Sequence, residues 1–113
     1  MAKNPPKFNS FSEFYPFYLT EHTKPTTKLL HFIGTTSGLL VWITHFLTFE
    51  VKWILVGLLC GYFFAWVSHF FVEKNKPASF KNPLWSFRGD WVMWAEILQG
   101  KHSIIPSLRD FQE

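Results

Sequence analysis

The sequence predicts an all-α fold: a membrane helical hairpin of two spans, flanked by interfacial amphipathic helices. Residues 29–49 and 54–72 contain no Asp, Glu, Lys or Arg, and each stretch is long enough to cross a hydrocarbon core about 30 Å thick. Their connection, centred on Glu50 and Val51, is too short for anything but an antiparallel pair. The 113 residues are expected to form a single membrane-embedded domain, residues 1–113.

The charge distribution predicts an integral membrane protein with both termini in the cytoplasm. Only Lys52 lies in the connection, whereas the other basic residues precede the first span or follow the second. A net charge of +3 suits contact with anionic membrane lipids. The basic residues form no dense stripe, so no nucleic-acid partner is expected.

The first helix is expected ahead of the spans. A capping-box pattern at residues 10–13 predicts a helix that runs to about His22. Its stripe at helical spacing is expected along the cytoplasmic membrane face: Phe11, Tyr15, Tyr18 and His22. Pro25 breaks this helix, and Thr26 or Thr27 is the expected N-cap of the first span.

The two spans are expected to pack closely. Gly34 and Gly38 in the first span, and Gly57 and Gly61 in the second, follow a small-xxx-small pattern that lets membrane helices approach each other. Gly34 follows His31 by three residues, so the close-packed face and the histidine face coincide at that end.

A last helix is expected to begin at residues 82–83 or at Asp90 and to end near Gly100. Its apolar face at helical spacing consists of Trp91, Trp94, Ala95 and Leu98. Tryptophans beside basic residues are typical of the headgroup layer.

The histidines form the candidate site. His31 lies 19 residues before Glu50 and His69 lies 19 residues after it, so continuous helices put both about 28 Å from the turn, at one level. Glu73 follows His69 by four residues, on the same helical face. His22 brings a third imidazole from the preceding helix.

These side chains predict a metal site. An ionisable side chain at the edge of a span is costly unless it is paired, hydrated or metal-bound. Three histidines and a glutamate suit Fe, Mn or Zn, and no thiolate is available because Cys60 lies in mid-span. Two histidines with a carboxylate are typical of non-haem Fe(II) oxygenases. The candidate metal-binding and catalytic residues are His22, His31, His69 and Glu73.

The simpler interpretation is that Glu73 only caps a helix end and His69 only hydrogen-bonds a neighbour. His45 and His102 receive no role.

Three segments carry a family resemblance: residues 22–31 (HTKPTTKLLH), residues 68–73 (SHFFVE) and residues 76–78 (KPA). In this order and spacing, and over about residues 14–100, the chain resembles a short form of the fungal 2-hydroxy-palmitate dioxygenase family. Thr23 stands where longer members often have histidine, Thr27 where asparagine is expected, and Ser68 where glycine is expected.

The resemblance implies a membrane dioxygenase that depends on Fe(II) and shortens 2-hydroxy fatty acids by one carbon, a step in degrading hydroxylated sphingoid-base chains. It assigns the family's histidines to His22, His31 and His69, with Glu73 beside them. The expected substrate is a lipid-like small molecule whose tail lies between the spans.

Two alternatives stay open. Opposed histidines on neighbouring membrane helices could ligate a haem in an electron-transfer protein. The hairpin could instead be a non-enzymatic scaffold that binds a partner through its glycine faces. Because two spans enclose little interior, a homo-oligomer is also expected.

Overall fold

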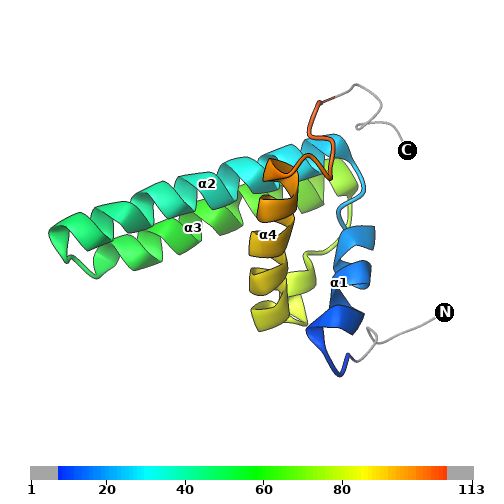
Figure 1. Cartoon of the computed structure of the whole chain (residues 1–113), viewed down its shortest axis with the longest axis horizontal. Helices are drawn as coiled ribbons and strands as arrows, with labels where there is room; N and C mark the ends of the chain where they lie inside the picture. The colour runs from blue at the N-terminus through cyan, green and yellow to red at the C-terminus, as the bar shows by residue number, and fades with distance from the viewer. Residues whose placement is uncertain (1–7, 107–113) are drawn as a thin grey trace.

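A computed structural model of the chain describes residues 8–106, and within this range the fold is all-helical, without strands (Figure 1). This confirms the predicted fold class. The elements in chain order are α1 (Phe11–Thr20), α2 (Pro25–Thr48), α3 (Lys52–Val67), the π-helix η1 (Ser68–Glu73), the 3₁₀ turn η2 (Ala78–Phe80) and α4 (Pro83–Leu98).

Helices α2 and α3 form the predicted antiparallel hairpin, which lies along the long axis of the molecule, while α1 and α4 pack together across one end of it (Figure 1). Phe49 adopts the left-handed conformation that ends α2, with φ of 59°. The tip of the hairpin projects away from α1 and α4 (Figure 1).

The glycines bring the two long helices into backbone contact, as predicted. A Cβ added at Gly38 would lie 2.8 Å from the carbonyl oxygen of Gly57, and one added at Gly34 would lie 2.9 Å from Cβ of Phe64. Distances this short leave no room for any side chain at these positions. The close approach of α2 and α3 thus depends on glycine.

The helix starts agree with the sequence in two cases and differ in one. The hydroxyl of Ser10 accepts a hydrogen bond of 3.2 Å from the backbone N–H of Glu13, and Pro83 opens α4, both as predicted. At α2, however, Pro25 occupies the first turn, so the helix begins before the two threonines expected to cap it. Proline fits there because its missing N–H would have no partner in the first turn.

The buried face of α4 differs from the predicted one. Its buried residues are Ser86, Gly89, Met93 and Ile97, whereas Leu98 is 61% exposed. An added Cβ at Gly89 would lie 3.0 Å from the ring of Tyr18 in α1. Trp94 instead faces α2 and donates a hydrogen bond of 2.9 Å to the hydroxyl of Thr36. Helix α4 thus packs against α1, α2 and η2, which a single apolar stripe does not describe.

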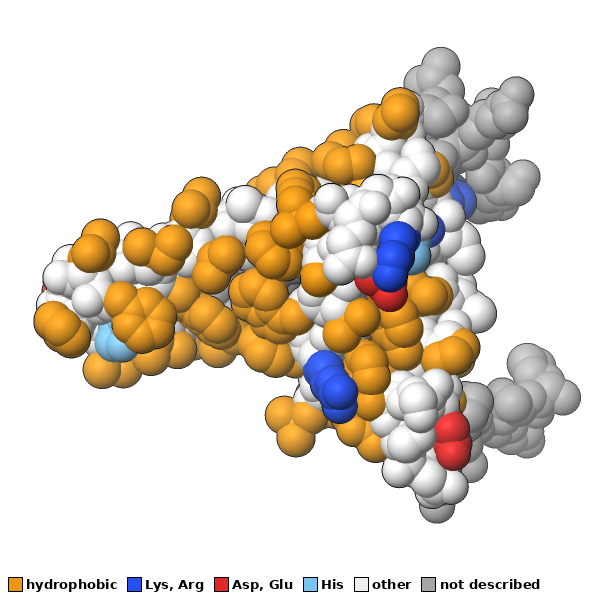
Figure 2. Space-filling view, viewed as in Figure 1, with side chains coloured by type: hydrophobic (Ala, Val, Ile, Leu, Met, Phe, Trp, Pro, Cys, Tyr) orange, Lys and Arg blue, Asp and Glu red, His pale blue; other side chains and the backbone are white. Residues whose placement is uncertain are grey.

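Large apolar side chains cover the outside of the hairpin, while the buried apolar cluster lies between α1 and α4: Phe14, Tyr18, Ala78, Met93 and Ile97. Figure 2 shows the apolar covering along the hairpin arm. The helical segments Pro25–Thr48 and Lys52–Glu73 are long and apolar enough to cross a membrane, with 17% and 22% of their most apolar windows buried. A core helix of a soluble protein would be mostly buried.

Candidate metal centre

Three histidines from separate segments meet at the end of the hairpin. His22 follows α1, His31 lies in the second turn of α2, and His69 lies in η1. Nε2 of His22 is 3.1 Å from Nε2 of His31 and 3.0 Å from Nε2 of His69. The side chains of all three are buried, with exposed fractions of 1%, 4% and 2%. Sequence reasoning placed His31 and His69 at one level and expected His22 to arrive from the preceding helix, and the structure brings all three imidazoles together.

The other ring nitrogen of each histidine faces an oxygen that accepts a hydrogen bond. Nδ1 of His22 donates to the carbonyl of Tyr18 (2.6 Å), and Nδ1 of His31 to that of Thr27 (3.1 Å). Nδ1 of His69 donates to the side-chain oxygen of Asn75 (2.7 Å). Since carbonyl oxygens only accept, each neutral ring carries its proton on Nδ1 and leaves a lone pair on Nε2.

Three Nε2 lone pairs that face one another fit a shared cation. With the protons on Nδ1, no hydrogen bond can join the three Nε2 atoms. A positive ion between them would relieve their mutual repulsion. The ligand nitrogens of all three histidines lie within 4.8 Å of one another. The group of His22, His31 and His69 could hold a metal ion.

The environment of His22 keeps its imidazole in the ligand form. The ring stacks on Tyr18 with centroids 4.0 Å apart. Burial, followed by the imidazoles of His31 and His69, holds the pKa of His22 well below its ordinary value. The ring is therefore neutral at pH 7, which is the form that binds metals.

His69 is oriented by a π-helix and by the residue that follows it. Short π-helical turns often occur at functional sites. Lys74 ends the turn in the left-handed conformation, with φ of 62°, and Asn75 donates its backbone N–H to the carbonyl of His69 (2.9 Å). The Asn75 side chain also donates to the backbone carbonyl of Glu21 (3.2 Å). Asn75 thus fixes the His69 ring relative to the end of α1.

The structure does not bring Glu73 into the group of three histidines. Its carboxylate accepts hydrogen bonds from the Thr23 hydroxyl (2.9 Å), the Lys24 backbone N–H (2.6 Å) and the Thr27 hydroxyl (2.6 Å). These donors lie just before α2 and in its first turn, at the helix N-terminus, where a negative charge is favourable. Glu73 therefore joins the end of η1 to the segment between His22 and His31.

The positions that depart from the family pattern take part in these contacts. Thr23 and Thr27 both donate to Glu73. The hydroxyl of Ser68 donates to the carbonyl of Ala65 (2.6 Å), and its oxygen lies 3.1 Å from Nδ1 of His31. All three side chains hold the residues of the site in place.

Two polar side chains of α4 reach the site, and sequence reasoning missed both. The Tyr18 hydroxyl donates a hydrogen bond to the carboxylate of Asp90, and burial raises the pKa of Asp90 to about 7. Ser86 is 3% exposed, and its hydroxyl has no hydrogen-bond partner among the described residues. A serine four residues before an aspartate, on a helix rich in apolar residues, was the available signal.

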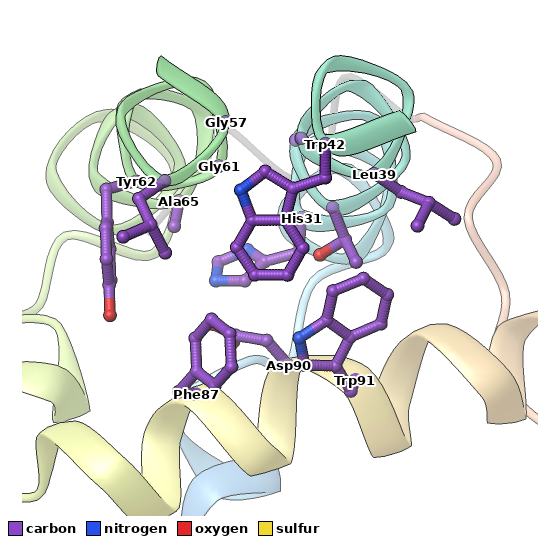
Figure 3. A pocket seen from close by; sticks show the side chains of 14 residues that line it. His31, Leu39, Trp42, Gly57, Gly61, Tyr62, Ala65, Phe87, Asp90 and Trp91 are labelled. Carbon is purple, nitrogen blue, oxygen red and sulfur yellow. The ribbon is translucent and has the colours of Figure 1, made fainter. Parts of the chain in front are cut away.

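Two adjoining cavities lie beside the histidines. One, with an empty volume of about 230 Å³, is lined by all three histidines together with Ser86 and Asp90. The other, of about 450 Å³, begins at His31 and runs between α2, α3 and α4 towards Trp42 (Figure 3). His31 and Asp90 line both cavities.

The remaining histidines lie elsewhere. Nδ1 of His45 lies 3.0 Å from the carbonyl of Glu50, at the hairpin tip. Nε2 of His102 lies 2.9 Å from the carboxylate of Glu96, which also accepts a hydrogen bond from the Tyr15 hydroxyl. Neither imidazole belongs to the group of three.

The ring arrangement does not fit the haem alternative. The ring centroids of the three histidines lie 4.4, 4.5 and 5.1 Å apart, and each pair meets edge to face. Imidazoles in direct contact leave no space for a porphyrin between them.

The chain matches a protein-family model, whereas no curated protein and no solved structure matches it. A family model described as 2-hydroxy-palmitic acid dioxygenase Mpo1-like matches residues 8–102, a range that includes all three histidines and both cavities. The chain therefore belongs to the Mpo1-like family.

Proposed function

We propose that this protein is an Fe(II)-dependent dioxygenase that acts on 2-hydroxy fatty acids, with His22, His31 and His69 as the metal ligands. The observation that carries the proposal is the convergence of three Nε2 lone pairs whose Nδ1 partners are all oxygen acceptors. The family description supplies the reaction class and the substrate class.

Iron suits both the donors and the reaction. Imidazole nitrogens bind Zn, Cu, Fe and Ni well, but zinc has no redox chemistry. Bound iron would supply the redox chemistry with dioxygen that a dioxygenase requires. Three protein nitrogens leave further coordination positions for the substrate.

Glu73 acts as a positioning residue in this proposal. Its three hydrogen bonds tie η1, which carries His69, to the start of α2, which carries His31. Because its oxygens accept these hydrogen bonds, the carboxylate positions His31 and His69 relative to each other and does not bind the metal. The sequence-based assignment of Glu73 to the site is kept, with this different role.

Ser86 and Asp90 are proposed to bind the polar head of the substrate. Both line the cavity that contains the histidines. A carboxyl group with a pKa of about 7 is partly protonated at neutral pH and can donate a hydrogen bond to a substrate carboxylate. The unpartnered Ser86 hydroxyl can donate a second one.

The substrate would reach the site from the bilayer. The two long apolar helices suit a membrane hairpin, and the basic residues beyond its open end favour a cytoplasmic location for both termini. The histidines lie at that end, where a lipid carboxylate meets water. Association of two or more copies would shield more of the exposed hairpin.

Product analysis tests the proposal. Anaerobically purified protein loaded with Fe(II) is given 2-hydroxypalmitate and dioxygen, and the fatty acid product is identified by mass. We expect a product one carbon shorter from the wild type and from His45→Ala, whose imidazole lies at the hairpin tip, and none from His69→Ala. Equal substrate consumption by His69→Ala and the wild type would exclude this function.

A further inference from the structure

We infer that Trp42 determines the length of the acyl chain that the protein accepts, because it closes the far end of an apolar groove that begins at His31. This inference rests on the proposed function and adds a specificity-determining residue to it. It assigns the larger cavity to the hydrocarbon tail of the substrate.

The groove is continuous with the histidine site at one end and apolar along its length. It is lined by the close-packed glycine faces of the hairpin and by apolar side chains of α2, α3 and α4. Its polar groups gather near the start, where His31 and Asp90 also line the smaller cavity. An amphiphile with its carboxylate at the histidines would therefore extend its tail towards Trp42.

The indole of Trp42 extends from α2 across to the backbone of α3. Its Nε1–H donates a hydrogen bond of 2.9 Å to the carbonyl of Ile54. The ring occupies the space over Gly57, where an added Cβ would lie 2.4 Å from Cδ1 of the indole. The rings of Phe87 and Trp91, from α4, lie 6.2 and 6.1 Å from it (Figure 3). These contacts form an aromatic end wall.

The distance from the site to this wall corresponds to a long fatty acid. Trp42 follows His31 by eleven residues along one helix, which is about 16 Å. A saturated chain with C–C bonds of about 1.5 Å advances about 1.25 Å per carbon, so about 13 carbons fit between the two residues. The head carbons lie beyond them, at the histidines.

Two substitutions change the groove in opposite directions. Trp42→Ala removes the end wall and is expected to extend the accepted length by several carbons. Thr35→Phe places a ring in the groove one helical turn beyond His31, and is expected to shorten it. Trp66→Ala is the matched control, because Trp66 is 43% exposed and does not line the groove.

The test measures binding and turnover over a series of saturated 2-hydroxy fatty acids of graded length. Dissociation constants are determined by calorimetry with the full chain in lipid nanodiscs, and iron content verifies that each variant is folded. For the wild type and Trp66→Ala, affinity should rise up to about fourfold per carbon and then stop rising at one limiting length. The limit should move to longer acids in Trp42→Ala and to shorter acids in Thr35→Phe.

The outcomes separate this inference from the proposed function. An unchanged limiting length in iron-loaded Trp42→Ala and Thr35→Phe would overturn the role of Trp42, as would wild-type binding that does not depend on length. Wild-type protein that binds acids with the expected limit but turns none of them over would overturn the proposed reaction and leave the length assignment standing.

Discussion

The hydroxyl of Thr27 donates a 2.6 Å hydrogen bond to the carboxylate of Glu73 and so joins the first turn of α2 to the last residue of η1. Thr27 also offers its backbone carbonyl to Nδ1 of His31. One residue thus links the carboxylate to a histidine of the site, while the carboxylate itself stays outside the group of three histidines.

Substitutions of Glu73 distinguish a positioning residue from a ligand. Glu73→Ala removes three hydrogen bonds to a charged acceptor and should lower the free energy of unfolding by about 1.5–3 kcal/mol or more. Glu73→Gln keeps an acceptor oxygen and should retain iron at the wild-type level. Thermal unfolding and metal analysis measure the two effects. A folded Glu73→Gln variant without iron would identify Glu73 as a ligand.

Asn75 should control iron affinity without being a ligand. Its side-chain oxygen accepts the Nδ1 proton of His69, and loss of such a partner typically lowers metal affinity about 10–100-fold. We expect Asn75→Ala to weaken iron binding by this factor, as measured by competition with a chelator. Asn82→Ala serves as the control, because the Asn82 side chain makes no capping hydrogen bond. Equal iron affinity in the two variants would contradict this role.

Ser86→Ala should weaken substrate binding without lowering stability. The hydroxyl is buried and has no partner among residues 8–106, so its removal breaks no hydrogen bond within that range. Loss of a hydrogen bond to the substrate corresponds to about a tenfold rise in the dissociation constant for 2-hydroxypalmitate. Calorimetry and thermal unfolding measure both properties. A destabilised variant with unchanged affinity would show that the hydroxyl is structural.

Asp90 should make the stability of the protein depend on pH. Burial raises its pKa from 3.8 to about 7 in the folded state. Because the folded pKa lies above the unfolded one, the stability it contributes is complete below about pH 4 and is lost as the pH rises through 7. Relative to Asp90→Asn, the wild type should therefore lose stability across that window in thermal unfolding. If the stability of the wild type and of Asp90→Asn changed with pH in the same way, the raised pKa of Asp90 would be contradicted.

Alanine substitutions at Gly38 and at Gly61, both at the contact between α2 and α3, should differ in their effect on stability. A Cβ at Gly38 would lie 2.8 Å from the backbone oxygen of Gly57, whereas one at Gly61 would lie 3.8 Å from that of Gly34. Gly38→Ala should therefore destabilise the hairpin by about 1–3 kcal/mol, and Gly61→Ala should have little effect. Unfolding in denaturant measures both. Equal stability of the two variants would show that the helices adjust freely.

Local spacing was sufficient to predict the hairpin and the meeting of the histidines. Equal counts from the turn put His31 and His69 at one level, and the glycine pattern predicted the contact between the spans. Both inferences hold because a helix converts sequence separation into distance.

Contacts between distant segments could not be predicted in the same way. From the sequence alone, the Glu73 carboxylate could bind a metal or accept hydrogen bonds at a helix N-terminus. Only the fold shows that it accepts hydrogen bonds from Thr23, Lys24 and Thr27. Asp90 lies 72 residues from Tyr18, its hydrogen-bond partner. The buried face of α4 likewise depends on which elements pack against it, and a helical stripe does not contain that information.

Iron binding by single histidine variants is the decisive test of a centre built from His22, His31 and His69. The full chain is purified anaerobically and titrated with Fe(II), and bound iron is measured for the wild type, His22→Ala, His31→Ala, His69→Ala and the control His45→Ala. We expect stoichiometric iron in the wild type and the control, and loss of tight binding in each of the other three. Wild-type iron affinity in any of those three folded variants would contradict a centre built from the three imidazoles.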